Sequence, residues 1–300
     1  MMKKSDDRVC FILNAQAQSG RAGKKIEWLK KEADRRWSDY DIYLTGKHGS
    51  AAELSRKDYK QYDVVVACGG DGTLHNAVNR ALHDNIVVGL LPIGSGNDFA
   101  KAIDLPKNLE ACLDIIKEGK TKQIDLLHCT GDAEKWCVNT LGMGLDGLAN
   151  KHTTRYKKST GNLSYFIGAV IAAVTFRGCR MEVAIDRENV SKEYLMITAC
   201  NGQVEGGSFV VGPEAKLDDG LIDLLTITPT PVLKLLYYLP KFRWGIPDGL
   251  KTASSVKCRR VEIRSSVGLS AHGDGEHLGS DIHKLNIELH PDALEVIVPG

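Results

Sequence analysis

The chain has 300 residues and a mass of 32.8 kDa, which is long enough for two domains or one large one. Apolar residues make up 43% and charged residues 26% of the chain, which excludes intrinsic disorder as its main description. Lys and Arg number 39 and Asp and Glu number 38, so the net charge of +1 argues against a protein that coats nucleic acid. Any anion must therefore be bound by a local arrangement of groups.

The eight cysteines are scattered without a Cys-x-x-Cys pair, so we expect neither a disulfide framework nor a zinc cluster. Cys10, Cys68 and Cys200 lie in apolar runs and are expected to be buried. The apolar run 9–13 is shorter than the ~7–15 residues of a secretory signal core. The longest nearly apolar stretch, 165–176, is shorter than the ~20 residues that span a bilayer. We therefore expect a cytoplasmic protein.

The first part of the chain alternates strand, loop and helix. Helical patterns are expected up to about Trp37, over 51–56 behind a cap at Ser50, and over 74–82. Buried-strand patterns occupy 8–13, 40–44, 62–68 and 86–91. This alternation predicts an α/β domain with a parallel sheet over residues 1–122.

The alternation of predicted strands and helices ends after Asp125. Two helices are expected, near 147–158 and 163–176. Most of the remainder consists of short strand candidates, at 181–185, 194–200, 221–228, 256–264, 284–289 and 294–298. This spacing predicts a mainly antiparallel β domain, a β-sandwich, over 123–290, with the tail 291–300 able to complete the first domain.

Glycine-rich loops follow three of the predicted strands. Residues 69–73 read Gly-Gly-Asp-Gly-Thr, between a buried strand and a helix, so their amide groups can point at a phosphate from a helix N-terminus. Residues 91–100 form a second such loop, and 14–24 form a third at the equivalent strand end. Asp71 would repel a phosphate unless a cation or a sugar hydroxyl intervened. Aligned loops at neighbouring strand ends predict a ligand crevice, whereas one loop alone also fits a tight turn capped by Thr73.

Two other glycine motifs do not apply. The chain contains no Gly-x-x-x-x-Gly-Lys-Ser/Thr sequence. Residues 142–147 match Gly-x-Gly-x-x-Gly, but a dinucleotide site also needs an acidic residue about 20 positions later, and 148–181 contain no Asp or Glu. A Rossmann dinucleotide site is therefore disfavoured.

Five blocks together resemble the catalytic domain of diacylglycerol kinases and their soluble bacterial lipid-kinase relatives. They are 69–73, Leu-Pro-Ile-Gly-Ser-Gly-Asn-Asp at 91–98, Asn-Gly-Gln-Val-Glu-Gly-Gly at 201–207, 213–223, and Gly-Asp-Gly-Glu at 273–276. The first block is shared with NAD kinases and more loosely with phosphofructokinases, whose parallel-sheet fold the resemblance implies for the first domain. The chain departs from the family at Ala15, where Pro is usual, and at Ser95, where Thr is commoner. Both changes keep the chemistry.

The resemblance implies transfer of the γ-phosphate of ATP, with Mg²⁺, to a lipid hydroxyl, with transient peripheral contact at a membrane and no nucleic-acid partner. It implies Asp274 as the general base and Glu276 as its companion or a metal ligand, although the same turn alone also fits a solvated hairpin. The implied nucleotide contacts are Asn14, Ser19, Gly20, Arg21, Thr45, Gly69, Gly70, Asp71, Gly72, Thr73, Leu74, His75, Gly94, Ser95, Asn97 and Asp98.

Metal ligands are implied at the oxygen-rich turn 213–223. The resemblance places a metal on the Asp219 carboxylate and on the backbone carbonyls of Lys216 and Leu221, and it links Asp125 to a magnesium–water network. His272 and His277 flank the acidic turn and are interpreted as surface or supporting residues.

Two segments are candidates for lipid contact. Residues 148–181 are basic without an acidic residue, which fits either an anion-facing surface or a solvated helix face. Residues 232–244 mix apolar, aromatic and basic residues, as in an interfacial segment or in ordinary packing. The sequence leaves open a homodimer, and also the alternatives of an NAD kinase and of a non-catalytic nucleotide or lipid sensor.

Overall fold

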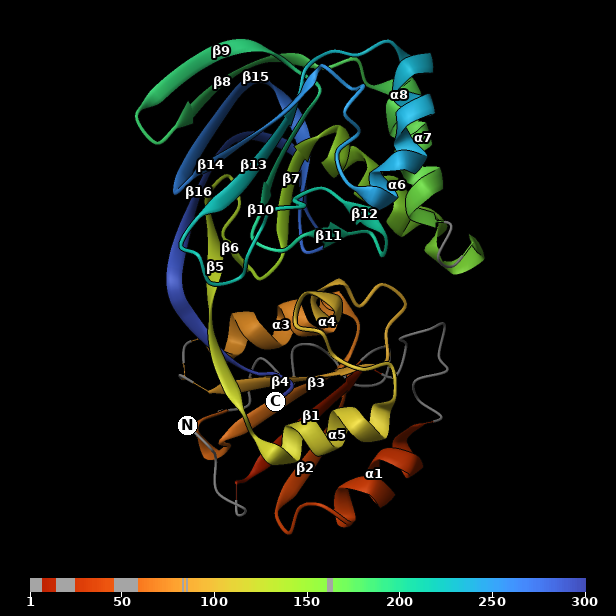
Figure 1. Cartoon of the computed structure of the whole chain (residues 1–300), viewed down its shortest axis with the longest axis vertical. Helices are drawn as coiled ribbons and strands as arrows, with labels where there is room; N and C mark the ends of the chain where they lie inside the picture. Colours follow the sequence, from red (N-terminus) through yellow and green to blue (C-terminus); the bar gives the residue numbers. More distant parts are fainter. Residues whose placement is uncertain (1–6, 15–24, 46–58, 83, 85, 161–163) are drawn as a thin grey trace. The chain divides into compact units, whose positions relative to one another are not determined.

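The computed structural model describes residues 7–14, 25–45, 59–82, 84, 86–160 and 164–300, except for the side chains of 154–160 (Figure 1). The chain divides into two compact units. Unit 1 comprises Met1–Ile124 and Asp292–Gly300, and unit 2 comprises Asp125–Pro291. The helix expected over 51–56 lies outside the described residues.

Unit 1 contains a parallel sheet with the order β4-β3-β1-β2. The last part of a long strand, β16, joins its edge, where Val296 pairs in parallel with Val88. The four strands that belong wholly to this unit are β1 (Val9–Asn14), β2 (Tyr40–Thr45), β3 (Val64–Gly69) and β4 (Val87–Pro92). β1 and β3 are almost entirely buried and rich in Val, Ile and Leu, as expected for strands covered on both faces.

Helices cover the sheet of unit 1. They are α1 (Ile26–Asp34), α3 (Asp71–Ala81), α4 (Asp98–Ala102) and α5 (Leu109–Glu118), with a short turn, η3 (Tyr59–Gln61). The sequence analysis did not identify α5, yet both of its ends are encoded locally. The Asn108 side chain accepts hydrogen bonds from the first-turn amides, and Gly119, with a φ of 69°, ends the helix.

Unit 2 is mainly antiparallel. Its strands include β5 (Thr121–Gly131) and β16 (Glu276–Ile297), which both continue into unit 1, and β6 (Lys135–Cys137), β7 (Thr140–Gly144), β8 (Cys179–Ile185), β9 (Glu188–Tyr194), β10 (Met196–Cys200), β11 (Val204–Glu205), β12 (Phe209–Val210), β13 (Ile222–Ile227), β14 (Ala253–Cys258) and β15 (Arg260–Gly273). Hydrogen bonding follows the order β14-β13-β10-β7-β15-β16. The first half of β15 pairs with β8 and its end pairs with β7, so this strand bends from one layer into another. The β-sandwich and the α/β fold expected from the sequence are both confirmed.

Three helical segments lie on one side of unit 2 in Figure 1: α6 (Leu145–Thr160), α7 (Ser164–Thr175) and α8 (Val232–Tyr238), the last continuing into η5 (Leu239–Trp244). Apolar side chains from α7, α8 and strands β10 and β13 form one core beneath them, which includes Ala172, Leu225 and Leu235. A second core, with Met143, Val183 and Leu285, lies between the strands. Among the described residues, no helix has the length and apolarity to cross a bilayer.

Several strand boundaries differ from the prediction. The run expected at 194–200 divides at Leu195, because β9 ends at Tyr194 and β10 begins at Met196. The run 256–264 is two strands, because Asp186 accepts hydrogen bonds from the amides of Arg259 and Arg260 at 3.0 and 2.9 Å and fixes a turn there. The separate strands expected at 284–289 and 294–298 are both part of β16, which continues through Pro291 and bends at Asp292, where φ is 51°. A strand tolerates proline at an edge position or a bulge, and Pro291 lies next to the irregular position at Asp292.

Candidate active site

The carboxyl ends of the parallel strands in unit 1 meet at one edge. Asn14 pairs with Thr45 across β1 and β2, and Gly69 pairs with Pro92 across β3 and β4. The Asn14 side chain also donates to the Thr73 hydroxyl, at 3.5 Å. The glycine loops after β3 and β4 therefore leave the sheet side by side, as the sequence predicts.

Asp71 joins these two loops. Its Oδ1 atom accepts hydrogen bonds from the amides of Asp98 at 2.7 Å and Phe99 at 3.2 Å. The Asp71 carboxylate thereby caps the N-terminus of α4, where a negative charge is favourable. The nucleotide contact expected of Asp71 stays a prediction beside this capping role.

The backbones of the two loops touch. The Gly94 amide donates to the Gly69 carbonyl at 3.0 Å, and a Cβ placed on Gly94 would lie 2.2 Å from the Cα of Gly70. Asn97 adopts the left-handed conformation, with φ of 52°, and its side-chain amide donates to the carbonyl of Gly94 at 2.9 Å. This close approach requires glycine at 94, whereas a Cβ on Gly70 would make a tight contact of 3.2 Å with the Cα of Gly94.

The N-terminus of α3 fits the phosphates of a nucleotide. Gly70 is its N-cap, and no side chain caps this helix. An uncapped first turn offers amide hydrogens and the positive end of the helix dipole to an anion. Residues 69–73 and 94–97 surround this position on the sheet edge.

The other predicted nucleotide contacts have different positions. Leu74 and His75 lie in α3 and are buried, with 1% and 3% of their surface exposed, and their contact with a nucleotide stays a prediction. Asp98 is 5% exposed and pairs with Lys101 at 2.8 Å. Ser95 is exposed. Ser19, Gly20 and Arg21 lie outside the described residues.

The acidic motif of unit 2 is a tight hairpin between β15 and β16. Asp274 and Gly275 have φ angles of 50° and 80°, as in the two-residue turns that favour Asp-Gly. The Asp274 carboxylate points back into unit 2 and accepts hydrogen bonds from the amides of Val138, Asn139 and Thr140 at 3.0, 2.8 and 3.2 Å. Asp274 is 7% exposed, so this carboxylate holds the hairpin in place.

Glu276 occupies a different environment two residues later. Its side chain is exposed at the start of β16, opposite Gly273. The Asp274 oxygens accept from main-chain donors, whereas Glu276 is exposed. The general-base role that the resemblance implies for Asp274 stays a prediction, and Glu276 is the exposed alternative beside it.

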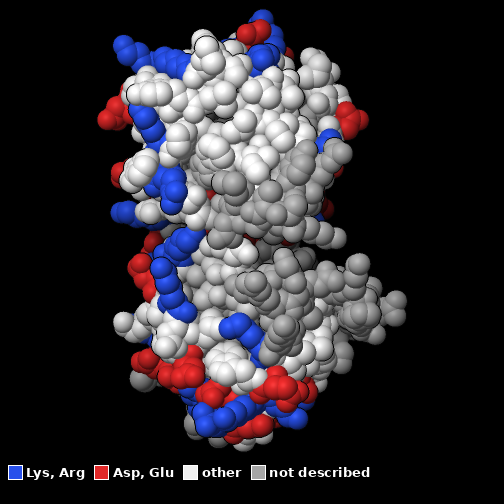
Figure 2. Space-filling view, turned by 90° about the vertical axis from the view of Figure 1, so that its right-hand side faces the viewer, with Lys and Arg blue, Asp and Glu red and all other residues white. Residues whose placement is uncertain are grey.

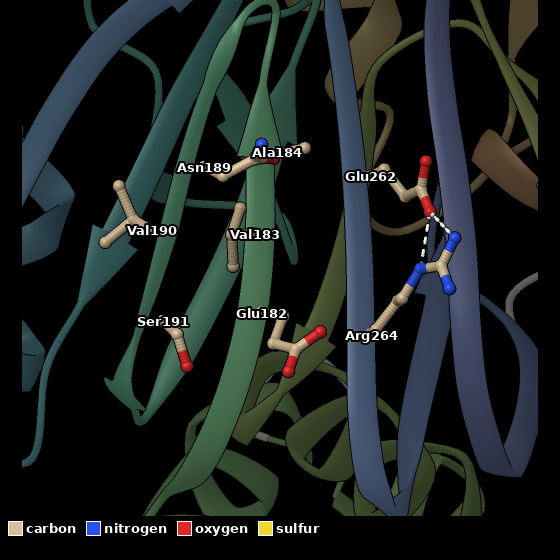
Figure 3. A pocket seen from close by; sticks show the side chains of 8 residues that line it. All are labelled: Glu182, Val183, Ala184, Asn189, Val190, Ser191, Glu262 and Arg264. Atoms are coloured by element: carbon tan, nitrogen blue, oxygen red, sulfur yellow. Dashed lines mark hydrogen bonds and ion pairs between the residues drawn. The ribbon is translucent and has the colours of Figure 1, made fainter.

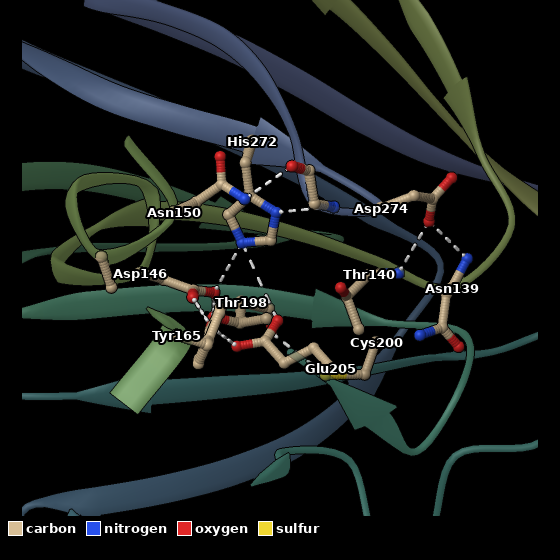
Figure 4. Close-up of polar contacts among 12 residues, drawn as sticks. Asn139, Thr140, Asp146, Asn150, Tyr165, Thr198, Cys200, Glu205, His272 and Asp274 are labelled. Carbon is tan, nitrogen blue, oxygen red and sulfur yellow. Dashed lines mark hydrogen bonds and ion pairs between the residues drawn. The ribbon is translucent and has the colours of Figure 1, made fainter. Parts of the chain in front are cut away.

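A buried polar cluster lies beneath the hairpin (Figure 4). Nε2 of His272 lies 3.1 Å from Oδ2 of Asp146 and 3.8 Å from Oε2 of Glu205. Nδ1 of the same ring accepts a long hydrogen bond from the Gly275 amide, at 3.3 Å. His272 is 1% exposed, so of the two interpretations, surface or supporting residue, its burial fits the supporting one.

The cluster retains a proton. The Tyr165 hydroxyl lies 2.6 Å from Oε1 of Glu205 and 3.0 Å from Oδ1 of Asp146. Tyr165 donates toward both oxygens, and its single hydrogen is shared between them. Burial, together with the charge of Asp146, raises the pKa of Glu205 well above its ordinary value, which favours its protonated form.

Asp146 and His272 form the charged pair of this cluster. Burial opposes ionisation of Asp146, but the positive charge and hydrogen bond of His272 outweigh it and lower the pKa of Asp146 to about 2. Burial alone would lower the pKa of His272, but the Asp146 charge raises it to about 9. A ring that carries a proton on Nδ1 cannot accept a hydrogen bond from the Gly275 amide. The hydrogen bond from Gly275 is therefore lost when His272 becomes positively charged.

The predicted metal turn already contains a cationic side chain. Nζ of Lys257 lies 2.9 Å from Oδ2 of Asp219 and 3.1 Å from Oδ2 of Asp223. Buried Asp125 accepts from the Gly220 amide at 2.8 Å, so it braces the same turn. Carboxylate and carbonyl oxygens suit Mg²⁺, and in this structure the Lys257 ammonium already balances the charge of Asp219. The metal site expected on Lys216, Asp219 and Leu221 stays a prediction.

The sequence analysis missed Asp146, Glu205 and Lys257. Asp146 lies within the 142–147 motif, and its glycines have a packing reason: a Cβ on Gly142 would lie 1.9 Å from the Asp146 carboxylate, and one on Gly147 would lie 2.1 Å from the Ser270 carbonyl. β7 pairs antiparallel on both sides, unlike the first strand of a dinucleotide fold. Glu205 was visible in the 201–207 block, whereas nothing in the sequence marked Lys257.

A groove on the outer strands of unit 2 holds none of the predicted site residues (Figure 3). An ion pair between Glu262 and Arg264 lies along it, at 2.5 Å. It is lined by Glu182, Val183, Ala184, Asn189, Val190, Ser191, Glu262 and Arg264.

Comparison with known proteins accounts for both units. Residues 8–129 match the family model described as diacylglycerol kinase catalytic domain, and residues 139–298 match the YegS C-terminal NAD kinase beta sandwich-like domain. The chain therefore belongs to the family that joins a diacylglycerol kinase catalytic domain to a YegS C-terminal domain. A diacylglycerol kinase of Mycobacterium tuberculosis is 29% identical to this chain, and the match covers 84% of this chain and 82% of the relative. A diacylglycerol kinase of Staphylococcus aureus is 26% identical, and the match covers 83% of this chain and 80% of the relative.

Solved structures show the same fold. A crystal structure of a diacylglycerol kinase from Bacillus anthracis superposes with a TM-score of 0.75 at 20% identity, over 99% of this chain and 98% of that one. An NAD kinase from Archaeoglobus fulgidus, solved in complex with ATP, gives a TM-score of 0.52 at 12% identity, over 97% and 93%. The fold expected from the resemblance is confirmed.

Proposed function

We propose that this protein transfers the γ-phosphoryl group of ATP to the hydroxyl group of a membrane lipid of the diacylglycerol type. Family membership supports the kinase reaction and the class of acceptor. The sheet edge of unit 1 supports nucleotide binding, and the acidic hairpin of unit 2 supports deprotonation of an alcohol.

The nucleotide half of the proposal depends on unit 1. The uncapped N-terminus of α3 and the paired glycine loops would hold the phosphates through main-chain amides. Asn14 and Thr45, at the ends of the neighbouring strands, would line the same edge. Mg²⁺ would arrive with ATP and neutralise charge on the phosphates. This pairing of two glycine loops at one sheet edge is the observation that carries the proposal.

The acceptor half depends on Glu276. The lipid hydroxyl oxygen would attack the γ-phosphorus while the bond from that phosphorus to the β–γ bridging oxygen breaks, so that ADP leaves. The hydroxyl proton would pass to the exposed Glu276 carboxylate and then to solvent. Asp274 would keep the hairpin in position through its three amide hydrogen bonds.

The test is a comparison of acceptors. The purified chain is incubated with ATP labelled at the γ-phosphate, with MgCl₂, and with either diacylglycerol in mixed micelles, NAD, or a total lipid extract analysed by mass spectrometry. We expect label in a phosphatidic acid or a related phospholipid. Label in NADP would favour an NAD kinase, and absence of transfer to every acceptor, with ATP bound, would favour a sensor.

A further inference from the structure

Helix α7 carries no charged residue. Its twelve residues pack Ala169, Ala172 and Ala173 inward, whereas Phe166 and Val174 are 36% and 44% exposed on the other side. A helix that is apolar all round is normally covered on all sides by protein or lipid. The outward side of α7 therefore lacks the polar cover expected of a surface helix.

The neighbouring segment α8–η5 continues this apolar surface. Leu235 and Phe242 are buried in the core, but Leu233, Tyr237 and Trp244 are 84%, 62% and 82% exposed. Leu233 and Tyr237 are four residues apart and share one helix face. Side chains of this size are rarely left in water together without a partner surface.

The charges on these elements are all positive. Residues 164–181 and 232–247 contain no Asp or Glu, whereas 232–247 contain Lys234, Lys241 and Arg243. The Lys241 ammonium lies 3.8 Å from the centre of the Tyr237 ring. Figure 2 faces the side on which α7 and α8 lie in Figure 1, and the described surface of unit 2 there is largely uncharged, with Lys, Arg, Asp and Glu toward its edges.

We propose that this α7/α8 face, made of the outward side of α7 and the exposed residues of α8–η5, docks on an anionic phospholipid bilayer. Exposed Trp and Tyr suit the headgroup level, Leu and Phe suit the acyl boundary, and Lys and Arg attract anionic lipid. The proposal rests on the proposed function, because a membrane lipid as acceptor requires a catalyst at the bilayer surface.

A second copy of this chain fits the face less well. A symmetric interface would bring Lys234, Lys241 and Arg243 of both copies together without acidic partners on these elements. The centres of protein interfaces are depleted in Lys, whereas a bilayer accepts a Lys whose stem lies along the apolar surface. Charge complementarity therefore favours an anionic lipid bilayer over a second copy of this chain as the partner of the α7/α8 face.

The experiment measures vesicle binding by sedimentation, separately from catalysis. The double variant Leu233→Ser, Trp244→Ser is compared with the wild-type chain and with Val256→Ser, Val267→Ser, a control whose residues are 41% and 48% exposed on β14 and β15. We expect the first variant to bind phosphatidylglycerol-containing vesicles about tenfold more weakly and the control to bind like wild type. Lys241→Gln should lose about fivefold on these vesicles and nothing on phosphatidylcholine vesicles.

Activity on a short-chain diacylglycerol dispersed in detergent separates this proposal from the proposed function. The double variant should keep wild-type turnover there, because no bilayer is involved. Vesicle binding without kinase activity would leave the docking face standing and reject the proposed function. Wild-type binding by the double variant would overturn the docking face, as would a dimer that the same variant converts to monomer without a change in vesicle binding.

Discussion

Two acidic side chains in one tetrapeptide have opposite surroundings. Asp274, in the left-handed region of the turn, uses its carboxylate to bind three consecutive amides of the 138–140 segment. Glu276 is exposed on the adjoining strand. The resemblance implied Asp274 as the base and Glu276 as its companion or a metal ligand, and spacing alone does not say which side of a hairpin each side chain takes.

This difference predicts separate effects of two conservative variants. Glu276→Gln should lower turnover by roughly 10²–10⁴-fold through loss of the proton acceptor, while the free energy of unfolding changes by less than about 0.5 kcal/mol. Asp274→Asn should lower the free energy of unfolding by about 1–3 kcal/mol, because its NH₂ group would face main-chain donors. Steady-state kinetics and urea unfolding measure the two effects. Wild-type turnover by Glu276→Gln would refute the assignment of the base.

At the scale of elements, the short helix α4 depends on a side chain from another element. Its five residues cannot sustain a helix alone, and its first amides are satisfied by Asp71 at the start of α3. The two glycine loops are thereby held together from both sides, by this carboxylate and by the Gly94–Gly69 hydrogen bond.

Loss of this cap should weaken nucleotide binding. Asp71→Ala should raise the Kd for ATP roughly tenfold, because α4 and the second loop lose their anchor, a cost of about 1–2 kcal/mol. Asp71→Asn retains an acceptor oxygen and should stay within about threefold of wild type. Titration with a fluorescent ATP analogue gives both values. Equal losses in the two variants would instead show that the charge of Asp71, and not its capping bonds, matters for the nucleotide.

The sequence predicted an element best where the apolar pattern of its residues matches the burial of that element in the fold. The buried runs of β1 and β3 and the glycines that end β3 were read correctly, because parallel strands leave a strong apolar signal. The break at Arg259 was missed because it depends on Asp186, more than seventy residues earlier in the sequence, and long-range caps have no local pattern. The continuity of β16 was missed because Pro291 imitates a strand end.

At the scale of the whole molecule, the candidate site could be predicted only in part. Motif blocks gave the glycine loops and the acidic hairpin. The buried cluster could not be predicted, because Asp146, Glu205 and His272 come from three separated segments and meet only through the pairing of β7, β10 and β15. The Lys257 pairing with Asp219 has the same origin, since β14 brings this lysine to the turn.

This cluster makes the stability of the molecule depend on pH. The pKa of His272 is raised from 6.5 to about 9, so its charge contributes fully below pH 6.5 and the contribution is lost as pH rises through 9. The pKa of Asp146 is lowered to about 2 in the folded chain. Its ionised form therefore contributes to stability above its ordinary pKa, and this contribution is lost as the pH falls through about 2. We expect the free energy of unfolding to fall by about 3 kcal/mol between pH 6.5 and 9.

Urea unfolding at several pH values measures this slope. His272→Gln should be less stable at pH 6.5 and should lose most of the decline toward pH 9. His283→Gln, at an exposed position, should follow the wild-type curve. A wild-type slope that persists in His272→Gln would assign the titration to another group.

The chain crosses between the two units twice, once in β5 and once in β16, and this has a consequence for biosynthesis. Val296 completes the sheet edge beside Val88, and a ribosome reaches it only after translating all of unit 2. The α/β layer is therefore begun first and finished last, whereas unit 2 is uninterrupted and can fold while unit 1 still lacks its final strand. In a nascent polypeptide of this topology the flank of β4 lacks its β16 partner until synthesis has passed residue 297.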